Sequence, residues 1–187
     1  MMKRSMFVLL GATALCLSGC GKKEEANVAT ADAGNSMAAA TPAAALSPEQ
    51  AFANVAASSD AFEIATSQLA LQKSASASVK KFAQQMVTAH TQSTAKLNAA
   101  TAAAAPAIVA DPTLTEAQQA RLDTLKNATG AAFDTAYIAE QRTAHEAALT
   151  TLRDYSLNGS VPSLKAFATE VVPTVAAHLN MAKGLKP

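Results

Sequence analysis

The chain has no tryptophan, only seven glycines among its 187 residues, and aromatic side chains at just 4% of the total. Half of the residues are apolar, and alanine accounts for much of that half. Alanine is the best helix former and glycine one of the worst, so this composition favours helices over a sheet. The length is typical of one domain of ordinary size.

An excess of basic charge is also missing, because fifteen lysines and arginines face fourteen acidic residues. The pairs Lys22-Lys23 and Lys80-Lys81 are too short to form binding patches. We therefore expect no nucleic-acid partner. The sequence contains neither a glycine-rich phosphate loop nor a convincing serine or cysteine nucleophile motif. We predict no catalytic residue and favour a protein that is not an enzyme.

The two cysteines, Cys16 and Cys20, both lie in the first twenty residues, so the folded part has no thiol chemistry. An apolar run over 6–17 follows two basic residues and is too short to span a bilayer. It leads into Leu-Ser-Gly-Cys, which resembles the lipobox of bacterial lipoprotein signal peptides. The resemblance implies removal of residues 1–19 and lipidation of the Cys20 thiol. The alternative is an ordinary secretory signal in which this cysteine is incidental.

The residues after the lipobox bear on location and domain boundaries. Gly21 stands second in the predicted mature chain, where an aspartate is linked in some bacteria with retention in the inner membrane. We therefore expect an exported protein anchored at the periplasmic face of the outer membrane, with the inner membrane as the alternative. Residues 20–46 hold few large side chains, so we predict a disordered tether there and one folded domain over 47–187.

Capping and breaking signals predict the helices of that domain. Ser47 precedes Pro48 and stands three residues before Gln50, which indicates a capping box and a helix start. Thr115 is followed in the same way by Gln118. Gly130 is expected to break a helical pattern, and an Asn-Gly pair at 158–159 to end one. The expected helices cover 48–73, 77–104, 116–127, 131–157 and 161–183.

Helix lengths support the break at Gly130. An unbroken helix over 116–157 would be roughly 63 Å long, whereas the first two helices would be about 39 and 42 Å long. With the break, four helices of similar length remain, which predicts an all-α fold of the antiparallel four-helix-bundle type. The short helix over 116–127 is then an extra element that we expect to cross the end of the bundle. Pro173 lies inside the last helix, where we expect a kink.

Each long helix carries one ionisable side chain on its apolar face. On helical wheels at 100° per residue these are Glu63, His90, His145 and His178. Measured from one end of an up-down bundle, they lie at depths of roughly 15 to 25 Å, so one polar layer in the core is predicted. Asp134 shares the face of His145 but is about 16 Å away along the helix, so we place it outside this layer.

Two interpretations of the layer follow, together with the possibility that the histidines lie at helix boundaries instead. Three imidazoles and one carboxylate suit zinc, copper or another late transition metal. Met86, one turn from His90, adds a soft ligand, and Gln141 and Tyr137 are expected around the site. In the metal-free alternative, Glu63 pairs with one histidine while Gln141 and Tyr137 hydrogen-bond the others.

A di-iron centre of the ferritin type is disfavoured. Such a centre needs two Glu-x-x-His pairs. Three residues before the histidines stand Val87, Arg142 and Val175 instead of glutamates.

Several segments carry a family resemblance. They are Phe-Glu-Ile at 62–64, Leu-Ala-Leu-Gln-Lys at 69–73, the run VKKFAQQMVTAHT at 79–91, Gly-Ala-Ala-Phe-Asp at 130–134 with the tyrosine and histidine that follow it, and the stretch 173–179. In this order they resemble the bacterial domain of unknown function 4142, whose members are often described as outer membrane proteins. The resemblance covers about 48–185 and implies an exported, ferritin-like four-helix bundle without an established activity.

The resemblance also implies which residues matter and where this chain departs from its family. The positions that it carries over are Glu63, His90, Asp134, Tyr137, His145 and His178. Members of the family often have an aspartate directly before the histidine of the second helix, where this chain has Ala89. If that aspartate binds a metal or orients a ligand in other members, this chain lacks the group.

These observations lead to two hypotheses about function. The first is a lipid-anchored helical bundle that binds a transition metal, zinc or copper, in its core. The second is a structural or interaction module of the cell envelope with a metal-free polar layer. In both, the expected partners are the membrane, through Cys20, and an envelope protein or a second copy of the chain.

Overall fold

The structure, a computed structural model, describes residues 45–187, and all the regular secondary structure in that range is helical. The five helices are α1 (Pro48–Lys73), α2 (Ala77–Ala102), α3 (Glu116–Asn127), α4 (Gly130–Asn158) and α5 (Pro162–Gly184). The expectation of an all-helical fold is confirmed. The expected signal peptide over 1–19, Cys20 and nearly all of the expected tether lie outside the described residues. None of the helices in the described range is both long and apolar enough to cross a bilayer.

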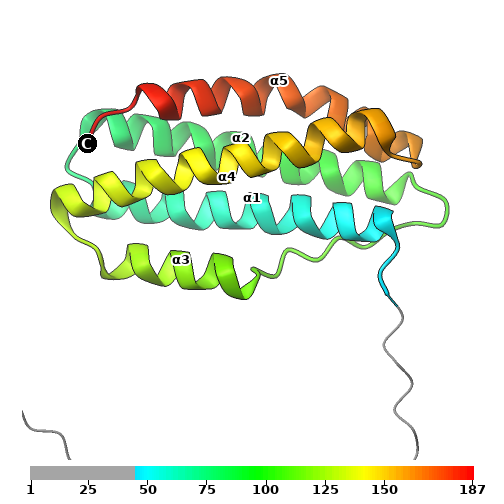
Figure 1. Cartoon of the computed structure of the whole chain (residues 1–187), viewed down its shortest axis with the longest axis horizontal. Helices are drawn as coiled ribbons and strands as arrows, with labels where there is room; N and C mark the ends of the chain where they lie inside the picture. Colours follow the sequence, from blue (N-terminus) through cyan, green and yellow to red (C-terminus); the bar gives the residue numbers. More distant parts are fainter. Residues whose placement is uncertain (1–44) are drawn as a thin grey trace, which may run out of the picture. The chain divides into compact units, whose positions relative to one another are not determined.

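Four long helices form the main body of the described part. α1 packs against α2 and α4, and α5 packs against the same two helices. Neighbouring long helices run in opposite directions, and short turns join α1 to α2 and α4 to α5 (Figure 1). The inward faces of these helices are apolar, and burying a leucine or phenylalanine side chain contributes about 1.5–3 kcal/mol, so this packing stabilises the fold.

The core consists of two apolar clusters with polar side chains between them. The first cluster comprises Phe52, Ala57, Leu97, Leu149, Leu152, Tyr155, Leu164, Phe167, Ala168, Val171, Val175 and Leu179. The second comprises Ala70, Val79, Phe82, Ala83, Met86, Leu125, Phe133, Tyr137, Ile138 and Ala182. Along α1, α2 and α4, most buried polar residues fall between the stretches that supply the two clusters, and the exceptions are Thr101 and Asp134. The helices therefore hold a polar layer inside an otherwise apolar interior.

The N-terminal caps follow the sequence signals with one difference. The Ser47 hydroxyl accepts from the Gln50 backbone N–H at 3.2 Å, as expected for a cap. The Gln50 side chain does not return to Ser47, and the predicted capping box there is wrong. Its Nε2 instead donates to Asn54 Oδ1 and to the Val109 carbonyl, which ties the loop before α3 to α1. The box predicted at Thr115 is present in full.

The two glycine signals act in different ways. α4 begins at Gly130 itself, one residue earlier than expected, and this glycine has a φ of 56°, which suits a residue without Cβ. Gly159 does follow the last residue of α4, but its φ is −61°. A Cβ on Gly159 would lie 2.4 Å from Cε1 of Tyr155. It would also lie 2.6 Å from the Tyr155 carbonyl oxygen, so the ring and the backbone of Tyr155 restrict the position, whereas the φ of Gly159 does not.

The short helix α3 does not cross the end of the bundle, so that expectation is wrong. It lies alongside α1 and also contacts α4 (Figure 1). Gln118 Nε2 donates to the Ser58 carbonyl at 3.3 Å, and the Arg121 guanidinium lies 5.4 Å from the centre of the Phe62 ring. The position of α3 follows from the loop over 103–115, which runs from the end of α2 back along α1 and is bonded to Gln50 and Asn54. α3 therefore covers only part of the seam between α1 and α4.

Candidate metal centre

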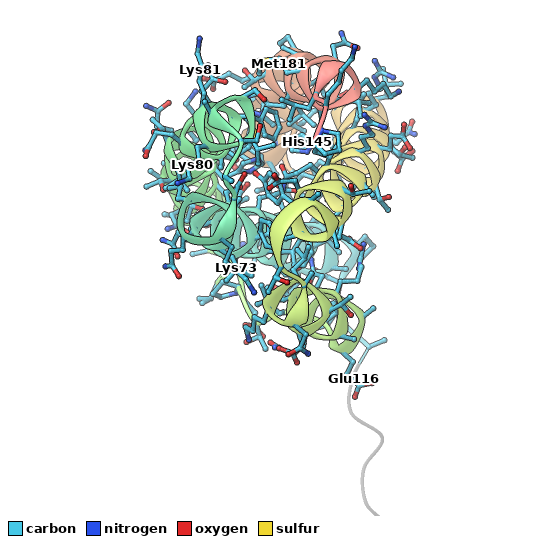
Figure 2. The ribbon with its side chains drawn as sticks, turned by 90° about the vertical axis from the view of Figure 1, so that its left-hand side faces the viewer. Lys73, Lys80, Lys81, Glu116, His145 and Met181 are labelled. Carbon is cyan, nitrogen blue, oxygen red and sulfur yellow. The ribbon has the colours of Figure 1, made fainter. Side chains whose placement is uncertain are left out.

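Three histidines from three helices meet in the polar layer. His90 of α2, His145 of α4 and His178 of α5 are 5%, 1% and 7% exposed. Their ring centres lie 5.5 to 5.8 Å apart, and one ring nitrogen of each lies within 4.8 Å of the others. Figure 2 shows His145 directed inward between the helices, whereas Lys81 and Met181 point outward. We call these three residues the histidine triad.

Each histidine of the triad has a buried nitrogen without a hydrogen-bond partner among the described residues. These atoms are His90 Nε2, His145 Nε2 and His178 Nδ1. Buried polar atoms in proteins are nearly always paired, because an unpaired one loses its bonds to water without replacement. Each imidazole of the triad therefore retains one nitrogen that is able to bind a further group.

The opposite nitrogens of two of these rings are held by acceptors. His90 Nδ1 lies 2.8 Å from Asp60 Oδ1, and His145 Nδ1 lies 2.8 Å from the Gln141 carbonyl oxygen. A carbonyl or carboxylate oxygen only accepts, so both Nδ1 atoms carry a proton. In the neutral ring, the lone pair is then on Nε2. This is the arrangement that orients a metal-binding histidine.

Asp60 is the residue that sequence reasoning missed. It is 5% exposed, and its second oxygen, Oδ2, accepts from Thr94 Oγ1 at 3.2 Å. It lies three residues before Glu63, and residues three apart lie on the same helix face. The helical wheel that selected Glu63 therefore also carried the signal for Asp60.

Glu63 lies beside the triad and not within it. Its Oε1 is 3.6 Å from His145 Nδ1, the nitrogen that already contacts the Gln141 carbonyl. Both of its carboxylate oxygens lack a hydrogen-bond partner among the described residues. Of the four side chains proposed from the sequence as ligands, the structure thus brings the three histidines together and places Glu63 behind one of them.

Burial controls the protonation of this layer. It raises the pKa of Glu63 to about 7, although the nearby charge of His90 opposes the shift. Burial, with the charge of His90, lowers the pKa of His145 to about 3 and that of His178 to about 4. Burial also disfavours protonation of His90, but the hydrogen bond to Asp60 and the negative charges of Glu63 and Asp60 outweigh it and raise its pKa. Two imidazoles are therefore neutral at pH 7, as metal binding requires.

The other residues singled out from the sequence form a surrounding set. Gln141 is fully buried, and its side chain donates to Thr66 Oγ1 at 3.2 Å. The Tyr137 hydroxyl lies 2.9 Å from Ser67 Oγ. Met86 belongs to the second apolar cluster. Gln141 holds His145 through its backbone carbonyl, and neither its side chain nor Tyr137 bonds a free nitrogen of the triad.

The remaining alternative placed the histidines at helix boundaries. Exposures of 7% or less place them in the interior instead. Asp134, which the family resemblance singled out, is also buried, and one of its oxygens has no hydrogen-bond partner among the described residues.

Two hollows reach the triad from different sides. His178 lines a surface groove between α2 and α5, together with Ala89 and Met181, which is 38% exposed. His90 and Asp60 line a cavity of about 200 Å³ on the side of α1 and α4. The groove offers a path from solvent to the triad through His178.

The fold resembles that of solved structures of a copper-binding protein. One, titled CopM in the Cu(I)-bound form, aligns with a TM-score of 0.60 and 17% sequence identity over 74% of this chain and 95% of that one. The other, CopM in the Cu(II)-bound form, gives a TM-score of 0.58 and 17% identity over 73% of this chain and 93% of that one. At this identity, the likeness establishes a shared fold.

Sequence comparison complements the structural one. No curated protein sequence matches the chain. A sequence profile described as "Domain of unknown function (DUF4142)" matches residues 34–185. This match covers most of the chain and includes the whole polar layer, as the resemblance of the quoted segments predicts. The chain belongs to the DUF4142 family.

Proposed function

We propose that this chain is a copper-binding protein of the cell envelope and that the histidine triad holds the ion. The observation that carries the proposal is the convergence of three buried histidines from three helices, each of which has one unpartnered ring nitrogen. Since one ring nitrogen of each histidine lies within 4.8 Å of the other two, a point exists within about 2.8 Å of all three, and movements of under about 1 Å would bring them to metal–nitrogen distances of 2.0–2.1 Å.

The donor set favours a late transition metal over a hard cation. Imidazole suits copper, zinc and nickel, whereas magnesium and calcium prefer oxygen ligands. The shared fold with Cu(I)-bound and Cu(II)-bound CopM favours copper among these metals, with zinc as the second choice. A di-iron centre is disfavoured, because the buried carboxylates of Asp60 and Glu63 contact the Nδ1 atoms of His90 and His145, whereas the unpartnered nitrogens of these two rings are the Nε2 atoms.

The buried carboxylates supply the charge that a copper ion needs in an apolar interior. An isolated ion is costly to bury, and nearby opposite charge reduces this cost. Asp60 contacts His90 directly, and Glu63 lies 3.6 Å from His145. A bound cation would favour the ionised form of Glu63. Together the two carboxylates can balance the charge of either oxidation state.

The architecture and location belong to the same proposal. The four long helices and their contacts support a ferritin-like antiparallel four-helix bundle with α3 as an extra helix. The Leu-Ser-Gly-Cys motif at 17–20 supports export and lipidation of Cys20, which would place the bundle at the periplasmic face of the outer membrane. An envelope protein that delivers or receives copper is the expected partner.

The alternative function is a structural module in which the layer only specifies packing. The Asp60–His90 hydrogen bond favours it, because that bond forms without metal. Against it, the layer leaves one nitrogen of each histidine unpaired, and such a layer destabilises an interior that apolar residues could fill.

Metal analysis distinguishes the two functions. The test uses the chain without residues 1–19 and with Cys20→Ser, so that no thiol contributes a ligand. We expect about one copper per chain to remain after dialysis, measured by mass spectrometry, and His145→Gln to abolish this retention. Thr143→Ala, on the exposed side of the same helix, is the control. Absence of retained copper, or equal retention by His145→Gln, would support the packing function.

A further inference from the structure

The cavity beside the triad is large for a gap between packed helices. Its volume is about 200 Å³, and most of its lining is apolar. Protein interiors contain few voids larger than a water molecule. For comparison, an engineered apolar cavity of about 150 Å³ binds benzene. The space between α1 and α4 is therefore sufficient for a small ring system.

Small side chains on α4 keep this space open. Ala144, Ala147 and Ala148 line it, and their spacing of three and four residues places them on one face of the helix. On the opposite side, Phe52 and Phe62 of α1 present aromatic rings. α3 covers the seam between α1 and α4 only in part, and Gln118 and Arg121 of that helix also line the cavity.

The polar side chains that line the cavity differ in their capacity for further hydrogen bonds. On α3, Gln118 donates to the Ser58 carbonyl, and Arg121 contacts Glu140 and the Phe62 ring. On α1, Asp60 is 5% exposed, and each of its oxygens accepts one hydrogen bond. An ionised carboxylate offers about four acceptor positions, so Asp60 can accept a further donor.

We propose that this cavity is a second binding site, which takes a small aromatic molecule with one N–H or O–H group that donates to Asp60. The apolar walls favour the ring, and the buried carboxylate of Asp60 favours a donor over an acceptor. The site does not require a bound metal, so this inference goes beyond the proposed copper function. Because Asp60 also holds His90, a molecule in the cavity contacts the same carboxylate that orients a histidine of the triad.

A matched pair of probes tests the site in metal-free protein. The probes are indole, which has an N–H donor, and benzofuran, which has the same shape but an oxygen in place of that group. Binding is measured by NMR titration of the chain without residues 1–19 and with Cys20→Ser, in the presence of a chelator. We expect saturable indole binding, with a dissociation constant at least tenfold lower than that of benzofuran.

Two alanine substitutions on α4 locate the binding. Ala148→Leu adds a larger side chain inside the cavity and should weaken indole binding at least tenfold. Ala139→Leu makes the same chemical change at an exposed position of α4 and should leave binding unchanged. Circular dichroism confirms the fold of each variant, and Ala56→Val, on the α1 wall, replaces Ala148→Leu if that protein does not fold.

Each contrary result overturns the inference. Absence of saturable indole binding, or equal binding by the wild type and the cavity variant, excludes the site. Equal affinity for indole and benzofuran excludes the role of Asp60 as acceptor. Because the titration is carried out without metal, these failures leave the copper proposal intact, and failure of copper retention leaves this inference intact.

Discussion

Replacing Glu63 by glutamine should make the metal-free protein less sensitive to rising pH. The Glu63 pKa is about 7 in the folded chain and 4.5 when the group is exposed. In the unfolded chain, ionisation of Glu63 therefore begins near pH 4.5, whereas in the fold it is delayed until about pH 7. The contribution of Glu63 to the free energy of unfolding is fully present below pH 4.5. It decreases as the pH rises from 4.5 to about 7, and above this pH it is lost.

The size of the effect follows from the same pKa difference. A change from 4.5 to about 7 corresponds to about 3 kcal/mol of unfolding free energy. Glutamine at this position has nearly the same shape and no charge to bury. Between pH 4.5 and 8, the stability of Glu63→Gln relative to the wild type should therefore rise by about 3 kcal/mol.

Urea denaturation followed by circular dichroism measures this difference, in a chelating buffer at pH 4.5, 6 and 8. The histidines of the triad also titrate over this range, and taking the difference between variant and wild type removes much of their contribution. Glu146→Gln is the matched control, because the side chain of Glu146 is 56% exposed and carries the same chemical change. Parallel pH profiles for Glu63→Gln and the wild type would refute the reasoning that burial alone keeps this carboxyl protonated.

Two further predictions test the site and the fold. Asp60→Asn keeps an acceptor for His90 but removes the charge, so it should weaken copper binding about 10- to 100-fold in a competition assay with a chromophoric chelator, and unchanged affinity would argue against a role for Asp60 at the metal. Gly159→Ala should lower the unfolding free energy by about 1–3 kcal/mol, because the new Cβ would lie 2.4 Å from the Tyr155 ring and 2.6 Å from the Tyr155 carbonyl oxygen, and a variant with wild-type stability in urea would show that the ring and the backbone both adjust without cost.

The helices could be predicted from the sequence because their signals are local. Ser47, Pro48 and Thr115 mark the helix starts, and a cap depends only on residues within one turn. The inward direction of the three histidines followed from the period of 3.6 residues. The same period places Asp60 on the face of Glu63, but periodicity alone does not indicate which of the two carboxylates contacts a histidine.

The placement of α3 could not be obtained in this way. The sequence indicated its length and cap, but its position depends on how far the loop before it extends back along α1. The contacts that hold it, such as Gln118 with the Ser58 carbonyl and Arg121 with the Phe62 ring, join residues about sixty positions apart. No local pattern encodes such contacts.

The sequence by itself determined the helical composition of this protein, most of the helix boundaries, its family and the presence of ionisable residues on four apolar faces. Only the tertiary structure decided that three histidines converge, that Asp60 and the Gln141 carbonyl orient two of them, and that Glu63 lies behind His145. It also decided that a cavity remains beside His90. The physical reason is that helix periodicity sets the direction of a side chain around its own axis, whereas the rotation, depth and spacing of helices relative to one another depend on packing across the whole core.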